Sequence, residues 1–297
     1  MTFSKRHLRT VVALLGTVLA LGWVWSQVDP TERAEALRQG DPRWLAFAVL
    51  LVPVQTLLAA ERWLQVSRAL GLPLTRREAW TEFGLSTAIN QILPGGIGGD
   101  AFRIWRQRSS GLARATRSAI ADRWWGQTTL LLFVVLGVLF WPDAMSQPDG
   151  LGGSAAFACV VVAGVWFVPT PIPAIGPLAA DLRRSAHRAP AICILLSISL
   201  LLAILAGFAA CGQAVGHESS RWVWSVAPLA LLAASLPISA GGWGLREGSL
   251  VLLLPYLGWS EAQALSVSVW FGLTFAMGTL PGLLVLTLRR PDTESTV

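Results

Sequence analysis

Two stretches of the chain share one spacing: the first reads Leu93-Pro94-Gly95-Gly96-Ile97-Gly98-Gly99-Asp100-Ala101-Phe102-Arg103, and the second reads Leu236-Pro237-Ile238-Ser239-Ala240-Gly241-Gly242-Trp243-Gly244-Leu245-Arg246. Each has Leu-Pro, three residues, Gly-Gly, three residues and Arg. Each interrupts an apolar segment, Phe83–Gly99 in the first case and Val223–Leu257 in the second. Proline ends a helix because it lacks a backbone donor, and paired glycines permit a tight turn. The stretches therefore predict two broken helices in an all-α protein.

The composition is that of an integral membrane protein. Of the 297 residues, 54% are apolar and only 13% are charged, and the mean hydropathy is +0.57. Soluble domains carry roughly 25% charged residues, so an ordinary cytosolic domain and a disordered chain are both excluded. The net charge of +6 is explained by the cytoplasmic excess of Lys and Arg in membrane proteins, so no nucleic-acid partner is expected.

A membrane-spanning helix needs about 20 mostly apolar residues. The stretches expected to span fully are Thr10–Val28, Trp44–Ala60, Ala119–Trp141, Ala155–Pro173, Ala189–Val215 and Leu265–Leu288. Thr10–Val28 follows a basic N-terminus, so a signal peptide is the alternative interpretation of it. Because its apolar run is long for a signal peptide and no A-x-A site follows, we expect an uncleaved span.

The distribution of Lys and Arg orients these spans. The connections at 61–79 and 100–118 are both rich in Arg. Both are predicted to be cytoplasmic, which a single crossing by Phe83–Gly99 would not allow. We therefore expect Phe83–Gly99 to enter and leave from the cytoplasm and Val223–Leu257 to do so from the outside. The alternative is eight full crossings with some charges on the wrong side.

The prediction is one integral membrane domain over residues 1–297, an all-α polytopic protein with about six full transmembrane helices and two re-entrant helical hairpins. Its repeat halves cover approximately 44–140 and 189–288. Hairpins entering from opposite faces indicate an inverted-topology repeat, which is common in transporters. We expect a multi-pass protein of the cell membrane with both termini in the cytoplasm.

The chemistry of the repeated stretch favours an anion site. A helix is expected to start at about Asp100 and at about Leu245, and its unpaired N–H groups and dipole attract anions. Arg103 and Arg246 are expected in the first turns, and a guanidinium fork suits phosphate. Asp100 and Glu247 also favour a helix start, and they could hold the arginines in the absence of a ligand.

Structural roles are the alternative at each of these positions. Glycine pairs such as Gly98-Gly99 also let helices pack closely, and arginines near a helix end can extend to the headgroups. For Arg246-Glu247, which has apolar sequence on both sides, function is favoured because buried ionisable groups are rare and costly.

Three further polar sites lie near the repeat. Glu61-Arg62-Trp63 follows the second span, where an interfacial anchor is the alternative role. Asp122 and Arg123 start the third full span, and adjacent helix residues do not face each other, so each needs another partner. An Asp122–Arg62 pair or an Arg123–Asp100 pair is possible. Asn90 could satisfy carbonyls that Pro94 leaves without a donor.

Metal, cofactor and catalytic constellations have no support in the sequence. The three cysteines, Cys159, Cys193 and Cys211, lie in apolar runs without a CxxC pair, and the histidines lack partner spacing. An intramembrane enzyme would have to use Asp100, Asp122 or Glu247, and no nucleophile or metal cluster accompanies them. We therefore expect no cofactor and no enzyme activity.

The motifs resemble the lysylphosphatidylglycerol synthase transmembrane-region family, also called flippase-like. The matching blocks are Ala60-Glu61-Arg62-Trp63, Asn90-Gln91-Ile92-Leu93-Pro94 with Gly98-Gly99-Asp100-Ala101-Phe102-Arg103, Asp122-Arg123, and Gly241-Gly242-Trp243-Gly244-Leu245-Arg246-Glu247-Gly248. Trp243 departs from the family pattern, in which a smaller residue is more usual. Larger members add a soluble aminoacyl-transfer domain, whereas this sequence ends soon after Arg290, so the resemblance implies the flippase-like part without synthase activity.

We therefore expect a lipid transporter whose anionic or phosphate-bearing lipid headgroup is held at both broken-helix N-termini. The alternative is a membrane partner that binds a lipid, without transporting it, for a glycosyltransferase or another lipid-modifying enzyme. The candidate binding residues are Arg62, Asn90, Pro94, Gly98, Gly99, Asp100, Arg103, Asp122, Arg123, Pro237, Gly241, Gly242, Arg246 and Glu247.

Overall fold

The apolar stretches fold as helices, and the described part of the chain contains no strand. The computed structural model describes residues 30–38, 40–92, 98–139, 176–217, 221–235 and 243–288. Its elements are α2 (Pro30–Arg38), α3 (Pro42–Ala69), α4 (Arg76–Ile92), α5 (Gly98–Arg106), η1 (Arg108–Ser110), α6 (Leu112–Leu139), α9 (Gly176–Arg188), α10 (Pro190–Ala214), α11 (Arg221–Ala234), α12 (Leu245–Leu253), η3 (Leu254–Leu257) and α13 (Glu261–Leu288).

Three of the described helices are long and apolar enough to cross a membrane. They are α3, α10 and the part of α13 from Glu261 to Gly282. The helix α6 covers the expected span Ala119–Trp141 as far as Leu139 and begins earlier, at Leu112. The expected spans Thr10–Val28 and Ala155–Pro173 lie outside the described residues, so the total number of crossings stays a prediction.

The helix α3 shows why charge alone does not mark the end of a span. Asp41 caps its first turn by accepting a hydrogen bond from the N–H of Arg43 (2.8 Å), with Pro42 at the first helical position. The helix then continues beyond Ala60 to Ala69, so Arg62 lies within it. Arg62 is only 6% exposed, and a charge at such a position requires a partner.

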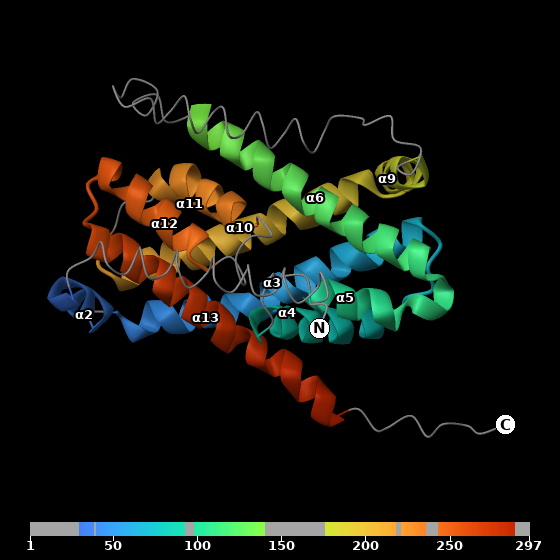
Figure 1. Cartoon of the computed structure of the whole chain (residues 1–297), viewed down its shortest axis with the longest axis horizontal. Coiled ribbons are helices and arrows are strands. Elements are labelled where there is room, and N and C mark those ends of the chain that lie inside the picture. Colours follow the sequence, from blue (N-terminus) through green and yellow to red (C-terminus); the bar gives the residue numbers. More distant parts are fainter. Residues whose placement is uncertain are drawn as a thin grey trace, which may run out of the picture.

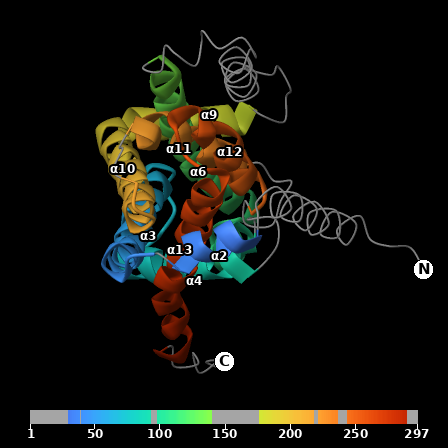
Figure 2. The ribbon, with the colours of Figure 1, turned by 90° about the vertical axis from the view of Figure 1, so that its left-hand side faces the viewer.

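The helices from α3 to α6 and those from α10 to α13 have corresponding packing partners (Figure 1). Consecutive helices pack against each other in both sets, which gives α3 with α4, α4 with α5 and α5 with α6 in the first, and the same order in the second. Between the sets, α6 packs on α11 as α13 packs on α4. The helices α3 and α10 lie side by side with α13 next to them (Figure 2).

A glycine lies where α6 crosses α11, and another lies where α13 crosses α4. A Cβ on Gly137 of α6 would lie 2.5 Å from the carbonyl oxygen of Trp224 in α11. A Cβ on Gly282 of α13 would lie 2.4 Å from the carbonyl oxygen of Gly84 in α4. Small residues let helix backbones approach closely in membrane proteins, so both crossings depend on a missing side chain.

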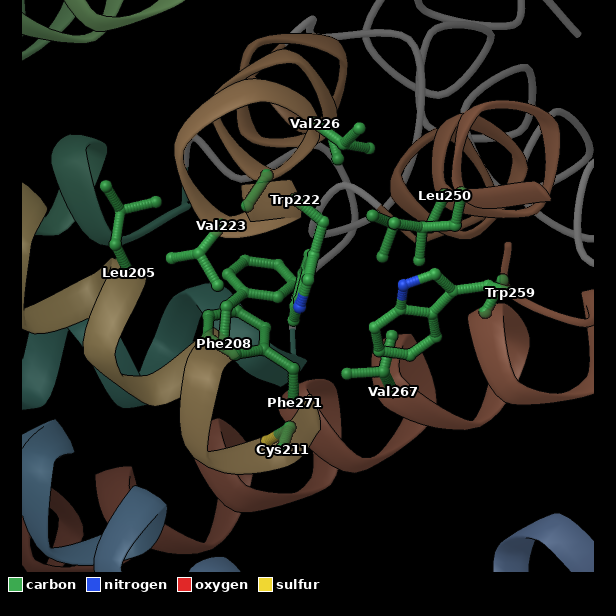
Figure 3. Packing of buried hydrophobic residues seen from close by; sticks show 14 of the residues in the cluster. Leu205, Phe208, Cys211, Trp222, Val223, Val226, Leu250, Trp259, Val267 and Phe271 are labelled. Carbon is green, nitrogen blue, oxygen red and sulfur yellow. The ribbon is translucent and has the colours of Figure 1, made fainter. Parts of the chain in front are cut away.

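The largest apolar core among the described residues joins α6, α10, α11, α12 and α13, and aromatic rings lie at its centre (Figure 3). Phe208 and Phe271 stack with ring centroids 3.7 Å apart. Trp222 meets Phe208 edge to face at 6.0 Å and Trp259 at 5.2 Å. This packing fixes α12 and α13 relative to each other and so positions the polar residues of the second repeat.

Candidate functional site

The first repeated stretch joins α4 to α5, which pack against each other. The side chain of Asn90 in α4 accepts a hydrogen bond from the N–H of Gly99 (2.7 Å). Asn90 therefore caps the start of α5. The sequence suggested a different role, in which Asn90 would satisfy the carbonyls that Pro94 leaves without a donor. A Cβ on Gly99 would lie 2.1 Å from the carbonyl oxygen of Ser86. Gly99 thus allows α5 to lie directly against α4, which is the packing role that the sequence left open.

Five charged residues from α3, α5 and α6 meet in one cluster, which we call the α5 cluster. It consists of Arg62, Asp100, Arg103, Asp122 and Arg123. One oxygen of Asp122 accepts from Nε of Arg62 (2.8 Å) and the other from Nη1 of Arg103 (3.3 Å). Asp100 pairs with Arg103 through one oxygen and with Arg123 through the other. Both of the pairs considered from the sequence, Asp122–Arg62 and Arg123–Asp100, are therefore formed.

Most of the α5 cluster is buried. Arg103 is 3% exposed and Asp122 is 2% exposed, whereas the side chain of Arg123 is 42% exposed, so the cluster reaches the surface there. The guanidinium of Arg103 lies over the rings of Phe83 and Trp63, 4.4 and 4.9 Å from their centroids. Among the described residues its Nε has no hydrogen-bond partner. Leaving such a donor unpaired costs free energy, so an additional acceptor would stabilise the cluster.

The second repeated stretch leads into α12, which begins at Leu245 as predicted. Arg246 donates through Nε to the hydroxyl of Ser268 (3.0 Å) and through Nη2 to Glu247 (2.6 Å). The other oxygen of Glu247 accepts from the N–H of Gly244 (2.5 Å). Glu247 is fully buried. Arg246 and Glu247, which we call the α12 pair, thus balance each other's charge within the protein.

The two arginines of the repeat do not occupy equivalent helical positions. Gly244 has a φ of +89° and precedes α12, so Arg246 lies in the first turn, as predicted. In the first copy, α5 already begins at Gly98, and this earlier start places Arg103 beyond the first turn. The expectation that both arginines lie in the first turn is therefore wrong for Arg103.

The structure divides the predicted binding residues between these two groups. Arg62, Asp100, Arg103, Asp122 and Arg123 form the α5 cluster, and Arg246 and Glu247 form the α12 pair. Gly98 is the first residue of α5. Asn90 and Gly99 form the contact at the start of α5 described above. Pro94, Pro237, Gly241 and Gly242 lie outside the described residues.

Two serines of the site could not be found from the sequence. Ser197 of α10 accepts from Nη1 of Arg62 (3.3 Å). Ser268 of α13 both accepts from Arg246 and donates to Glu247 (2.9 Å). Each lies in a long apolar helix, where a serine is as consistent with helix packing as with a polar contact. No local signal therefore marks either residue as an arginine partner.

Glu61, next to Arg62, belongs to the surface and not to the α5 cluster. It accepts from Nη2 of Arg76 (3.0 Å), whose side chain is 58% exposed, and from the indole N–H of Trp80 (3.3 Å). Within the described ranges, no three His, Cys, Asp or Glu side chains gather as a metal site would require.

Comparisons with known proteins agree with these motifs. The family model described as the lysylphosphatidylglycerol synthase TM region matches residues 10–282. A UPF0104 membrane protein of Methanothermobacter thermautotrophicus is 25% identical over 138 residues, which are 45% of this chain and 40% of that protein. The chain therefore spans less than half the length of this curated relative. With nearly its whole length matched by the family model, the chain belongs to the family of the lysylphosphatidylglycerol synthase transmembrane region, a family of membrane proteins.

Proposed function

We propose that this protein binds a membrane lipid by an anionic or phosphate-bearing headgroup and moves that lipid across the bilayer. The observation that carries the proposal is the α5 cluster, in which Arg62, Arg103 and Arg123 gather around the carboxylates of Asp100 and Asp122. Buried charges are rare unless they are paired, and in membrane proteins such ionisable groups often mark a substrate pathway. Arginine presents several donors in a planar fork that matches phosphate oxygens.

The packing of the helices supports movement of the lipid. The corresponding partners of α3 to α6 and of α10 to α13 are consistent with the inverted-topology repeat and the two re-entrant hairpins expected from the sequence. In such proteins, one repeat rocks against the other around a central site. The α6–α11 and α13–α4 contacts would be the sliding surfaces. The proposal places the chain in the cell membrane as a multi-pass protein with both termini in the cytoplasm.

We assign no catalytic step to this protein. The carboxylates considered for an intramembrane enzyme, Asp100, Asp122 and Glu247, all serve as partners of arginines. A lipid-binding partner of another membrane enzyme remains the alternative function. It would use the same cluster, and it differs from a transporter only in leaving the lipid in its original leaflet.

Reconstitution into liposomes tests the proposal. Liposomes carrying a fluorescent phospholipid are treated with an impermeant quencher, which reports how much label has changed leaflet. We expect wild type to equilibrate the label and Arg103→Ala to abolish this movement. Arg76→Ala, which removes an exposed arginine, is the matched control and should behave as wild type. The proposed mechanism is wrong if folded, inserted Arg103→Ala protein moves the lipid as fast as wild type. Lipid bound without movement would instead support the alternative.

A further inference from the structure

We infer that a groove between α6 and α11 binds one acyl chain of a membrane lipid, and that Arg221 at its end favours a lipid with an anionic headgroup. This site is separate from the α5 cluster. Leu136 of the groove lies about four turns beyond Asp122 of the cluster in α6, which is roughly 20 Å along the helix axis. The inference goes beyond the proposed function, because it does not require that the lipid crosses the bilayer.

The groove is lined by the same helical spacing on both of its sides. Each helix contributes positions i, i+3 and i+4, which share one face of a helix. The cavity that these two faces enclose has a volume of about 470 Å³. Ligand sites in proteins typically have volumes of about 300–1,000 Å³ and mostly apolar walls. The lining residues are Phe133, Leu136 and Gly137 of α6 and Arg221, Trp224 and Ser225 of α11.

The groove opens beside the point at which α6 and α11 cross. There, a Cβ on Gly137 would lie 2.5 Å from the carbonyl oxygen of Trp224, so the two backbones are in close contact. Helices that cross at an angle separate on either side of their closest point, and this separation leaves room for a ligand. Phe133 packs against the largest apolar core, so the groove is backed by the packed interior of the protein.

The surface around the groove favours a lipid chain as its occupant. Leu132 and Leu136 of α6 are exposed, and Trp224 of α11 is 51% exposed. Exposed apolar surface of this kind marks contact with a membrane or a ligand. Water would fill the groove only if several polar groups held it, and the hydroxyl of Ser225 already donates to the carbonyl oxygen of Arg221 (3.0 Å). In a membrane protein, the apolar chain at hand is a lipid tail.

Arg221 is the feature of the groove that distinguishes one lipid from another. Because the groove opens onto lipid tails that are equally apolar, exchanging one tail for another brings little hydrophobic gain. Arg221 is exposed and is the first residue of the apolar helix α11, so it lies at the end of the groove where a headgroup would lie. No carboxylate of the described residues pairs with its guanidinium. An anionic headgroup complements this charge, whereas a zwitterionic headgroup brings a cation of its own.

Photoactivatable lipids test this inference in proteoliposomes. The probes are phosphatidylglycerol and phosphatidylcholine that carry a diazirine in the same acyl chain, and mass spectrometry of peptides locates the labelled residues. We expect phosphatidylglycerol to label Leu136 and Trp224 more than phosphatidylcholine does, by roughly twofold to fivefold for one arginine near the membrane surface. Leu50 of α3, which is 70% exposed, lies outside the groove and should show no such preference.

Two variants separate the contribution of the tail from that of the headgroup. Arg221→Gln should lower phosphatidylglycerol labelling of the groove to the level of phosphatidylcholine and leave phosphatidylcholine labelling unchanged. Leu136→Trp, which fills the groove, should lower the labelling of Phe133 by both lipids. Leu57→Trp, at a residue of α3 that is 44% exposed, is the matched control for an added indole and should leave the labelling of Phe133 unchanged.

The inference is overturned if both lipids label the groove and Leu50 alike, or if the preference for phosphatidylglycerol survives in Arg221→Gln. Labelling of Leu50 without labelling of Leu136 or Trp224 would mean that another part of the protein covers the groove, and it would also overturn the inference. Groove labelling as expected, together with no movement of lipid in liposomes, would refute the proposed function and leave the groove site intact.

Discussion

Replacing Asp122 by Asn is predicted to destabilise the protein strongly while leaving the shape of the side chain almost unchanged. Asp122 is 2% exposed, and its oxygens accept from Arg62 at 2.8 Å and from Arg103 at 3.3 Å. The amide of Asn keeps one acceptor and no charge, so two buried arginines lose their shared carboxylate. Removing one partner of a buried ion pair typically costs about 3–5 kcal/mol.

Thermal unfolding in detergent, followed by circular dichroism, measures this loss. For a chain of this size, a change of 1 kcal/mol moves the melting temperature by roughly 2–4 °C, so Asp122→Asn should lower it by roughly 6–20 °C. The matched control is Glu61→Gln, which breaks the ion pair with the 58% exposed Arg76. Such surface pairs contribute under about 1 kcal/mol. Equal melting temperatures for the two variants would refute the reasoning.

Three smaller predictions follow from the same structure. Gly99→Ala should cost about 1–3 kcal/mol, because its Cβ would lie 2.1 Å from the carbonyl oxygen of Ser86. Gly84→Ala, whose Cβ would lie 3.7 Å from its nearest neighbour, should leave the melting temperature nearly unchanged, and a reversed order would contradict the packing. Asn90→Ala should cost about 0.5–2 kcal/mol by removing the acceptor for the N–H of Gly99, and a melting temperature equal to that of wild type would show that this cap contributes nothing. Partial burial lowers the pKa of His217 in the folded state, so the unfolded chain binds the proton more readily. Stability should then fall as the pH drops through about 6.5 and towards the lower folded value. His217→Gln should flatten this dependence in melting curves between pH 5 and 8, and an unchanged slope would count against the assignment.

The positions where helices break were largely predictable from local sequence. Proline and glycine act on the backbone of their own neighbourhood. The expected helix start at Leu245 is therefore confirmed, and the start expected near Asp100 falls at Gly98. The all-helical class was also predictable, because composition indicates it without any knowledge of which helices pack together. The lipid and its movement remain predictions.

The partners of the charges were not predictable in this way. Arg62 lies inside α3. Its carboxylate partner comes from α6, sixty positions along the chain, and no local pattern identifies a partner that far away. The sequence offered Asp122–Arg62 and Arg123–Asp100 as possibilities, and only the packing of α3, α5 and α6 could show that both pairs form together. Ser268 gave no signal at all, since its role depends on α13 lying against α12.

The contrast between the two repeats shows that helix packing and site chemistry are set by different residues. The corresponding crossings depend on glycines, which act through the absence of a side chain. The charge balance depends instead on where the carboxylates lie relative to each arginine. Glu247 follows Arg246 and neutralises it directly, whereas Ile104 follows Arg103, so Arg103 must draw its carboxylates from Asp100 and from α6. In the first copy, Arg62, Arg103 and Arg123 therefore share the carboxylates of Asp100 and Asp122. Corresponding helix crossings thus surround two different arrangements of ion pairs, one shared among three helices and one formed by neighbouring residues.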